Sequence, residues 1–538
     1  MRFRQNRRCV PVKSARVRIR ARAHFCIHMK AQSFIKGALI ISVGGIVAKL
    51  LGALYRIPLT NILGGEGMGI YQMVYPLYCL LLTVSATGIP SGLARLVSQA
   101  EFSGARASAG VLRKSLFLFS AIGIAGSAVM FLTAPAMSAL QGEPGAVNAY
   151  RALAPSVFLV SVISCFRGYF QGKSNFLPTA LSEIVEQAVK IGLGLFFARA
   201  FAQDVRRAVE YALFAVTASE LAACAFMLIL AAGDRGRRPL YRELPAQPRA
   251  LSLLRVTIPV TVAAGILPLS NILDSILIVR LVGQYAENAT ALYGLYSGGA
   301  ATLVNLPVSV CYGLAAASIP AVSAMQAEGK NAEAEERVLF AVKCTLYVAL
   351  PAAAFLFLFP AQISSFLFPS VTGEEGSALA GLVRALSLAA VFLSLVQTLS
   401  ACLTGRGKPK VAALSMTIAV AVKIGAELIL LRIPQISVLG AAYASVGCYF
   451  VALFINLLYS IKERKNRVRV YGQFAKFALL AAAAVAAAYP FGRVHALAAF
   501  AVTAAVYVAL SVLFRAFTGE ELHVAWRKKH DNRRRIGV

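Results

Sequence analysis

Charge is scarce in this chain. Asp, Glu, Lys and Arg together make up 14% of its 538 residues, whereas a soluble globular protein carries about 25%. Hydrophobic residues make up 58% of the sequence, and the mean hydropathy is +0.70. A soluble fold could not bury this much apolar surface. The composition therefore excludes an ordinary soluble enzyme and indicates a protein whose solvent is the lipid bilayer.

Histidine is also rare, and the cysteines are not paired. The five histidines lie near the termini or in one short late loop, and the nine cysteines are scattered without a CxxC pair. Metal sites and disulfide frameworks need ligands at short, regular spacings. We therefore expect no metal, no cofactor and no enzyme active site of this kind.

Long apolar stretches, in contrast, recur along nearly the whole chain. Each is close to the ~20 residues with which a helix crosses about 30 Å of hydrocarbon, and the alternating ~10-residue segments of a membrane β-barrel are missing. We predict an all-α polytopic membrane protein with about fourteen transmembrane helices. The expected spans are 33–54, 70–93, 112–133, 147–170, 178–199, 208–232, 252–280, 291–319, 338–359, 377–403, 410–431, 438–460, 473–491 and 495–515.

Acidic residues are outnumbered, at 23 against 54 Lys and Arg, so the net charge is +31. The bases gather in alternate connections between the spans, above all in 235–249 and 462–470, and the opposite connections carry few. This bias follows the positive-inside rule. It predicts a bacterial plasma-membrane protein with both termini in the cytoplasm, and it explains the charge without nucleic acid.

The first 28 residues hold nine Lys and Arg and no acid. Either they form a cytoplasmic tail that binds anionic lipid, or translation starts at Met29, after which a short basic head precedes the first apolar run. We favour the second interpretation.

The stretch RGYFQGKSNFLP (167–178) resembles a phosphate-binding loop. A P-loop has four residues between its two glycines and follows a buried strand. Here three residues separate Gly168 from Gly172, and the stretch joins two expected membrane helices. The sequence therefore argues against ATP hydrolysis at this motif.

Two parts of the chain repeat one another at an offset of 233 residues. QGKSNFLPTALSEIVEQAVKIG (171–192) aligns without gaps with TGRGKPKVAALSMTIAVAVKIG (404–425), which places Lys190 on Lys423. We interpret spans one to six and seven to twelve as two parallel copies of one six-helix lobe, followed by two C-terminal helices. The expected parts are a basic extension (1–28), an N-lobe (29–240), a C-lobe (241–465), the last two spans (466–515) and a basic cytoplasmic tail (516–538).

Ionisable residues inside the expected spans are the candidate site residues, because a charge in the bilayer is costly. Lys49 and Arg56 share a face of the first span, where they line a cavity, or Arg56 extends to the outer surface. Asp274, in the middle of the seventh span, binds substrate, pairs with a base across the lobes, holds a coupling cation or forms a purely structural ion pair. Arg280 lies near the outer end of that span. The other candidates are coupling or structural charges: Glu183, Glu186, Lys190, Arg384, Lys423 and Glu427.

The segment SFIKGALIISVGGIVAKLLGALYRIPLTNILGGEGMGIYQMVYPLY (33–78) resembles the start of the family of stage V sporulation protein B and related polysaccharide-biosynthesis membrane proteins. The resemblance continues through GIPSGLARLVSQAE (88–101) and the turn that begins at Arg167. The family belongs to a superfamily with multidrug extruders, O-antigen flippases and the lipid II flippase. The resemblance implies two lobes around a cavity lined by spans one, two, seven and eight. It also implies that Lys49, Arg56 and, more loosely, Arg280 bind an anionic headgroup.

On these grounds we expect a flippase that moves an undecaprenyl-pyrophosphate-linked saccharide from the inner to the outer leaflet by alternating access. Two alternatives stay open. A cation-coupled multidrug exporter of the same fold would use Asp274 or Glu186 as its cation site. A non-transporting scaffold would recruit cell-wall synthesis enzymes. The expected partners are the bilayer and a lipid-linked anionic saccharide.

Overall fold

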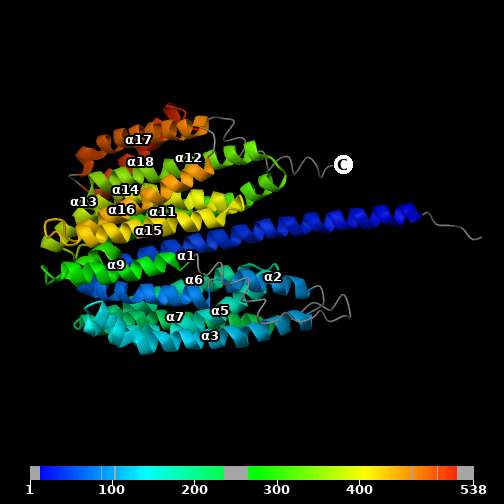
Figure 1. The fold of residues 1–538 in the computed structure, drawn as a ribbon, viewed down its shortest axis with the longest axis horizontal. Coiled ribbons are helices and arrows are strands. Elements are labelled where there is room, and N and C mark those ends of the chain that lie inside the picture. Colours follow the sequence, from blue (N-terminus) through cyan, green and yellow to red (C-terminus); the bar gives the residue numbers. More distant parts are fainter. Residues whose placement is uncertain are drawn as a thin grey trace, which may run out of the picture.

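The chain folds into two groups of helices that lie side by side, with the long helix α1 running between them (Figure 1). The computed structural model describes residues 12–86, 88–101, 105–234, 265–461, 464–492 and 495–517. Every regular element in these ranges is a helix, which confirms the all-α prediction. The helical segment before Gly168 also lacks the strand that a P-loop requires.

The N-lobe contains the helices up to residue 233. They are α1 (Val12–Ser85), α2 (Ile89–Glu101), α3 (Ala105–Leu140), the short η1 (Pro144–Ala146), α4 (Val147–Leu153), α5 (Pro155–Gly172), α6 (Leu177–Ala200) and α7 (Val205–Gly233). Gly64, with φ 67° and ψ −172°, breaks α1 into a first half (12–63) and a second half (65–85). Glycine suits this position because other residues rarely adopt a positive φ.

The C-lobe contains the helices from residue 266 onwards. They are α9 (Ile266–Val282), α10 (Ala289–Gly294), the π-helical η2 (Leu295–Ala300), α11 (Ala301–Ala327), α12 (Asn331–Leu358), α13 (Pro360–Leu367), α14 (Gly373–Gly405), α15 (Pro409–Leu430) and α16 (Leu439–Ser460). The last two helices, α17 (Arg464–Gly492) and α18 (Ala496–Leu513), follow. Phe477 of α17 belongs to the hydrophobic core of this lobe, so the appended helices pack against the C-lobe.

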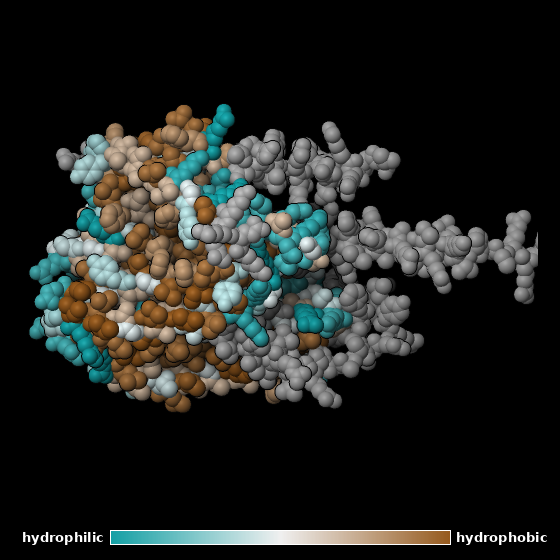
Figure 2. All heavy atoms as spheres, turned by 45° about the horizontal axis from the view of Figure 1, so that its top comes forward, coloured by the Kyte–Doolittle hydropathy of each residue, from teal (hydrophilic) through white to brown (hydrophobic). Residues whose placement is uncertain are grey.

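The outer surface of the bundle is suited to lipid. Hydrophobic side chains cover the middle of the face in Figure 2, and hydrophilic ones gather toward the ends of the bundle. Large apolar residues on different helices are strongly exposed, among them Phe117 (83%), Leu132 (75%) and Leu479 (72%). In water this surface would be unfavourable, whereas in hydrocarbon it has no such cost.

The expected spans all fall on described helices, although the seventh (252–280) is described only from residue 265. Ten helices in the described ranges are long and apolar enough to cross a membrane. The multi-pass architecture is thus confirmed, and the count of fourteen stays a prediction. Residues 235–264 and 518–538 lie outside the described residues, and with them the expected lobe boundary at 240 and nearly all of the basic tail.

Two predicted spans have different bounds in the structure. The second (70–93) ends at Ser85, and Pro90 is the second residue of the separate helix α2. The fourth (147–170) is divided at Pro155, which begins α5. Proline lacks the backbone N–H that continues a helix, so it is found in the first turn of the next one.

The sequence repeat corresponds to matched packing in the two lobes. Gly172 and Gly405, which align at the offset of 233 residues, each end a helix. A Cβ at Gly172 would lie 2.7 Å from the backbone oxygen of Ala94, and one at Gly405 would lie 2.9 Å from that of Ile319. Both glycines therefore allow a close approach of neighbouring backbone, α2 in the N-lobe and α11 in the C-lobe.

The residues that follow these glycines also have matched roles. Lys173 is bonded to the carboxylate of Asp234, which follows α7, and Arg406 donates to the backbone carbonyl of Ser460, which ends α16. The GKS motif is thus the point where the ends of α5 and α7 are tied together. These contacts join helix ends and do not form a nucleotide-binding loop.

The lobes meet at the end of the bundle where α1 breaks at Gly64, which we call the closed end. A Cβ at Gly69 would lie 2.1 Å from the backbone oxygen of Thr290, and a Cβ at Gly294 would lie 2.1 Å from that of Gly65. The two contacts correspond to each other: in each, a glycine of one lobe meets the residue four positions before the equivalent glycine of the other lobe. Only glycine permits this separation of the backbones.

Side-chain hydrogen bonds reinforce the closed end. Asn61 donates to the carbonyl of Leu367 at 2.8 Å, and Gln141 donates to the hydroxyl of Ser275 at 2.8 Å. Each of these bonds joins the N-lobe to the C-lobe. The two lobes are consequently locked together at one end of the bundle.

Candidate functional site

A cavity of about 640 Å³ lies between the lobes. It adjoins the first half of α1, which runs from the cavity toward the closed end at Gly64. Both halves of α1, together with α5 and α6, form most of its wall, and α11 closes it from the C-lobe with Asn305, Ser309 and Tyr312. The resemblance implied a cavity lined by spans one, two, seven and eight. Three of these contribute, but none of the described residues of α9, the seventh span, does.

Small residues on α1 make the space. Gly45, Ala48 and Gly52 line the cavity and precede Arg56 on the same helix. Their spacing of three and four residues places them on one helical face. Because this face carries almost no side-chain volume, the guanidinium of Arg56 adjoins open space.

Three basic residues line the cavity: Arg56 on α1, Arg167 on α5 and Lys190 on α6. Arg56 is half-buried. Among the described residues no carboxylate lies within 4 Å of it. Arg56 is therefore a base in the cavity wall whose charge is not matched by a direct ion pair there.

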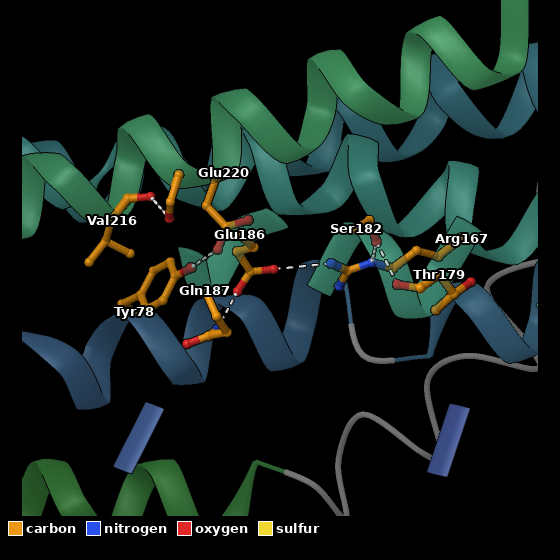
Figure 3. Close-up of polar contacts among 9 residues, drawn as sticks. Tyr78, Arg167, Thr179, Ser182, Glu186, Gln187, Val216 and Glu220 are labelled. Carbon is orange, nitrogen blue, oxygen red and sulfur yellow. Dashed lines mark hydrogen bonds and ion pairs between the residues drawn. The ribbon is translucent and has the colours of Figure 1, made fainter. Parts of the chain in front are cut away.

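Acidic residues share the same wall. Glu183 and Glu186 of α6 line the cavity, and Glu220 of α7 is buried close behind Glu186 (Figure 3). The carboxylate of Glu186 accepts from Arg167 Nη2 at 3.0 Å and from Gln187 Nε2 at 3.2 Å. The cavity thus carries both signs of charge.

The position of Arg167 is fixed by α6. Its Nε donates to the hydroxyl of Ser182 at 2.9 Å, while Nη2 binds Glu186. Ser182 and Glu186 are four residues apart on α6, so they present adjacent acceptors on one face. The guanidinium spans these two acceptors and is held against the cavity wall (Figure 3).

Glu220 has a partner that the sequence did not reveal. The hydroxyl of Tyr78, from the second half of α1, donates to its Oε1 at 3.3 Å. The other carboxylate oxygen, Oε2, has no hydrogen-bond partner in the described part of the chain. This arrangement leaves an acid with incomplete hydrogen bonding directly behind the cavity.

A second charged cluster lies in the C-lobe, away from the cavity. Lys423 of α15 is in contact with Asp274 of α9, and its ammonium lies 3.7 Å from Glu427. The side chains are sealed from solvent, with exposures of 7% for Lys423, 5% for Asp274 and 0% for Glu427. Both partners of Asp274 lie in the C-lobe, so this geometry favours a structural ion pair over a pair across the lobes.

The remaining predicted site residues lie elsewhere. Arg280 is exposed near the closed end and donates to the carbonyls of Ala139 at 2.6 Å and Leu140 at 3.0 Å, so it does not face the cavity. Arg384 is exposed on α14. The side chain of Lys49 is outside the described residues, although its backbone belongs to α1.

Arg167 is the functional candidate that the sequence analysis missed. It lies near the C-terminal end of the apolar run that predicted the fourth span, and it was named only within the P-loop-like motif and the turn that carries the family resemblance. A signal was present, because an arginine within an apolar run is costly unless it has a partner. The tyrosines Tyr55, Tyr71 and Tyr75, which also line the cavity, carried no comparable signal.

Metal binding has no support in this geometry. No group of three or more His, Cys, Asp or Glu residues in the described ranges could hold a metal ion. The cavity combines cationic and anionic side chains with tyrosines, which suits an organic or phosphate-bearing ligand better.

Comparison with known proteins identifies relatives along most of the chain. The family described as polysaccharide biosynthesis protein matches residues 34–326. Stage V sporulation protein B of Bacillus subtilis (strain 168) is 25% identical over 512 residues, covering 92% of this chain and 98% of that protein. The lipid II flippase MurJ of the same organism is 23% identical over 458 residues, covering 80% and 82%.

Solved structures show the same fold. The lipid II flippase MurJ in an inward closed conformation superposes with a TM-score of 0.68 at 14% identity, over 88% of this chain and 98% of that one. An inward-facing multidrug resistance transporter of the MATE family superposes with a TM-score of 0.66 at 18% identity, over 81% and 98%. The chain accordingly shares the fold of these two multi-pass proteins.

Proposed function

Because this chain belongs to the polysaccharide biosynthesis protein family, matched over residues 34–326, we propose that it is a flippase for an undecaprenyl-pyrophosphate-linked saccharide. It moves the headgroup from the inner to the outer leaflet of a bacterial plasma membrane. The observation that carries the proposal is the cavity between the lobes with Arg56 in its wall. The lipid II flippase among the relatives supports this class of substrate.

The chemistry of the cavity suits a phosphate-bearing headgroup. A guanidinium presents several N–H donors in one plane, and charge-assisted bonds to phosphate oxygens are among the stronger hydrogen bonds in proteins. Arg56 offers such donors without competition from a carboxylate within 4 Å in the described ranges. Lys49 precedes it by seven positions, two turns along the same helix, and is proposed as a second base.

The mechanism follows from the closure at one end. The headgroup enters the cavity from the cytoplasmic side while the polyprenyl tail stays in hydrocarbon. The contacts of the closed end then break, the opposite end closes, and the headgroup leaves on the outer side. Moving two negative charges outward through a potential of 100 mV, negative inside, releases about 4–5 kcal/mol. The membrane potential can therefore drive turnover without ATP.

The experiment is rescue of a bacterium depleted of its lipid II flippase. We expect the wild-type chain to restore growth and Arg56→Ala to fail at equal abundance in the membrane. Arg151→Ala is the matched control, because Arg151 is exposed and lies outside the cavity. Equal rescue by wild type and Arg56→Ala would contradict the assigned site.

A cation-coupled multidrug exporter is the second candidate, and one observation favours it. Glu183 and Glu186 line the cavity, and carboxylates suit organic cations. Efflux of a cationic dye from cells that express the chain discriminates the two. Dye efflux without rescue of the flippase-depleted strain would support the exporter.

A further inference from the structure

We propose that Glu186 is a tethered competitor of the anionic ligand: a phosphate group displaces its carboxylate from Arg167, and the displaced carboxylate takes up one proton. This inference rests on the proposed function and deepens it. It explains why an acid lies in the wall of a cavity that is proposed to bind an anion.

The geometry places Glu186 where a phosphate oxygen would bind. Its Oε2 is 3.0 Å from Arg167 Nη2, the position of an acceptor in a charge-assisted bond. Both side chains line the cavity, and both are only partly exposed, 14% for Arg167 and 17% for Glu186. A headgroup that enters the cavity thus meets a guanidinium whose Nη2 is already occupied by a carboxylate of this chain.

Bases and acids share the cavity wall before any ligand arrives. Among the described residues, the wall contains Arg56, Arg167 and Lys190 together with Glu183 and Glu186, and Glu220 is buried beside Glu186. A diphosphate diester adds two negative charges. In a partly desolvated cavity such an excess is unfavourable. Protonation of one carboxylate removes half of it.

The neighbours of Glu186 make it a proton acceptor once its cation is taken. The described titratable residues that line the same cavity are Tyr55, Arg56, Tyr71 and Tyr75 on α1, Arg167 on α5, Glu183 and Lys190 on α6 and Tyr312 on α11, and Tyr78 and Glu220 lie near it (Figure 3). Arg167 is the basic group to which it is directly bonded. Once phosphate takes that guanidinium, Glu186 is left beside the buried carboxylate of Glu220 (Figure 3), and two adjacent carboxylates favour the uptake of a proton.

The reaction is an exchange of partners. The Arg167–Glu186 ion pair breaks, an Arg167–phosphate pair forms, and an O–H bond forms on Glu186 with a proton from solvent. No covalent bond of the ligand changes. Affinity for the anion is therefore set by how strongly Glu186 competes, and it rises as the pH falls.

The test is calorimetric binding of a farnesyl-diphosphoryl-N-acetylglucosamine probe to the purified full-length chain in detergent. Each phosphate of this diester carries a single charge that does not titrate near neutral pH. Titrations in buffers of different ionisation enthalpy count the protons exchanged. We expect the wild type to take up about one proton per probe bound. A wild type that binds the probe without proton uptake would overturn the inference.

The variant Glu186→Gln supplies the second arm. It removes the charge but keeps the size of the side chain, so we expect binding of the probe to tighten by about tenfold and proton uptake to vanish. Glu210→Gln, a carboxylate of the same lobe outside the cavity, is expected to behave as the wild type. Equal or weaker binding by a folded Glu186→Gln chain would overturn the inference.

The binding measurements distinguish failure of this inference from failure of the proposed function. If the wild type binds the probe no better than the uncharged farnesyl glycoside of the same sugar, both are wrong. If the wild type prefers the diphosphate but Glu186→Gln shows no gain, the flippase proposal stands and the competitor role falls.

Discussion

The ammonium of Lys423 is in contact with the carboxylate of Asp274, inside the C-lobe and sealed from solvent. Lys423 is the repeat counterpart of Lys190, which lines the cavity in the N-lobe. The lysine is common to both lobes, but of these two lysines only Lys423 has a carboxylate within 4 Å among the described residues. One copy of the motif is thus open to a ligand, and the other forms a buried ion pair.

Removal of one member of this buried pair is expected to destabilise the chain. Lys423→Met leaves Asp274 and Glu427 without a cation, so we expect a loss of about 3–5 kcal/mol. Asp274→Asn is expected to cost less, because Glu427 remains 3.7 Å from Lys423. Thermal unfolding in detergent measures both. Lys410→Met, at an exposed lysine of the same helix, is the control, and a similar midpoint for it and Lys423→Met would contradict the prediction.

Arg280 is expected to hold the closed end shut. Its guanidinium donates to the carbonyls of Ala139 and Leu140 at the C-terminal end of α3, where a cation is favourable. Arg280→Ala should shift the population toward separation of the lobes at this end. Spin labels at the exposed positions Ala136 and Gln284 report the change as a longer inter-label distance.

The same variant separates a gating role from a binding role. In the calorimetric assay Arg280→Ala is expected to retain the proton uptake of the wild type, because Arg280 does not line the cavity. If the label distances are unchanged and the probe no longer binds, Arg280 contributes to ligand binding and not to closure.

Gly69→Ala is expected to prevent closure of the lobes. The added Cβ would lie 2.1 Å from the backbone oxygen of Thr290, and neither backbone can yield without opening the contact. We expect loss of rescue in the flippase-depleted strain. The matched control is Gly425→Ala, since a Cβ there meets nothing within 4 Å and alanine favours a helix by about 1 kcal/mol. Full rescue by Gly69→Ala would show that this contact is dispensable.

Lys173→Ala tests the function of the stretch 167–178, which resembles a phosphate-binding loop. Lys173 is bonded to Asp234, so the substitution should loosen the tie between α5 and α7 and lower the unfolding temperature modestly. We expect neither the wild type nor the variant to release phosphate from ATP. ATP hydrolysis that depends on Lys173 would refute the assignment of the motif as a helix tie.

Much of the architecture could be predicted because its signals are local. The apolar runs specify membrane helices by length alone, as in α14 and α16, whose bounds differ little from the expected spans 377–403 and 438–460. For Arg56 the sequence left two positions open, the wall of a cavity and the outer surface, and the structure places it in the cavity wall. The bounds drawn from hydropathy alone did not divide the fourth span at Pro155, because an average over many residues does not respond to a single break in a helix.

What the sequence determined by itself is therefore the solvent of this protein, its helical class and the duplication that aligns Lys190 with Lys423. What only the tertiary structure decided is which charges meet. Asp274 and Lys423 are 149 residues apart, and Arg167 finds Glu186 on the next helix only because α5 and α6 pack with those faces together. Hydrophobic length is a property of one segment, whereas an ion pair depends on the relative placement of two.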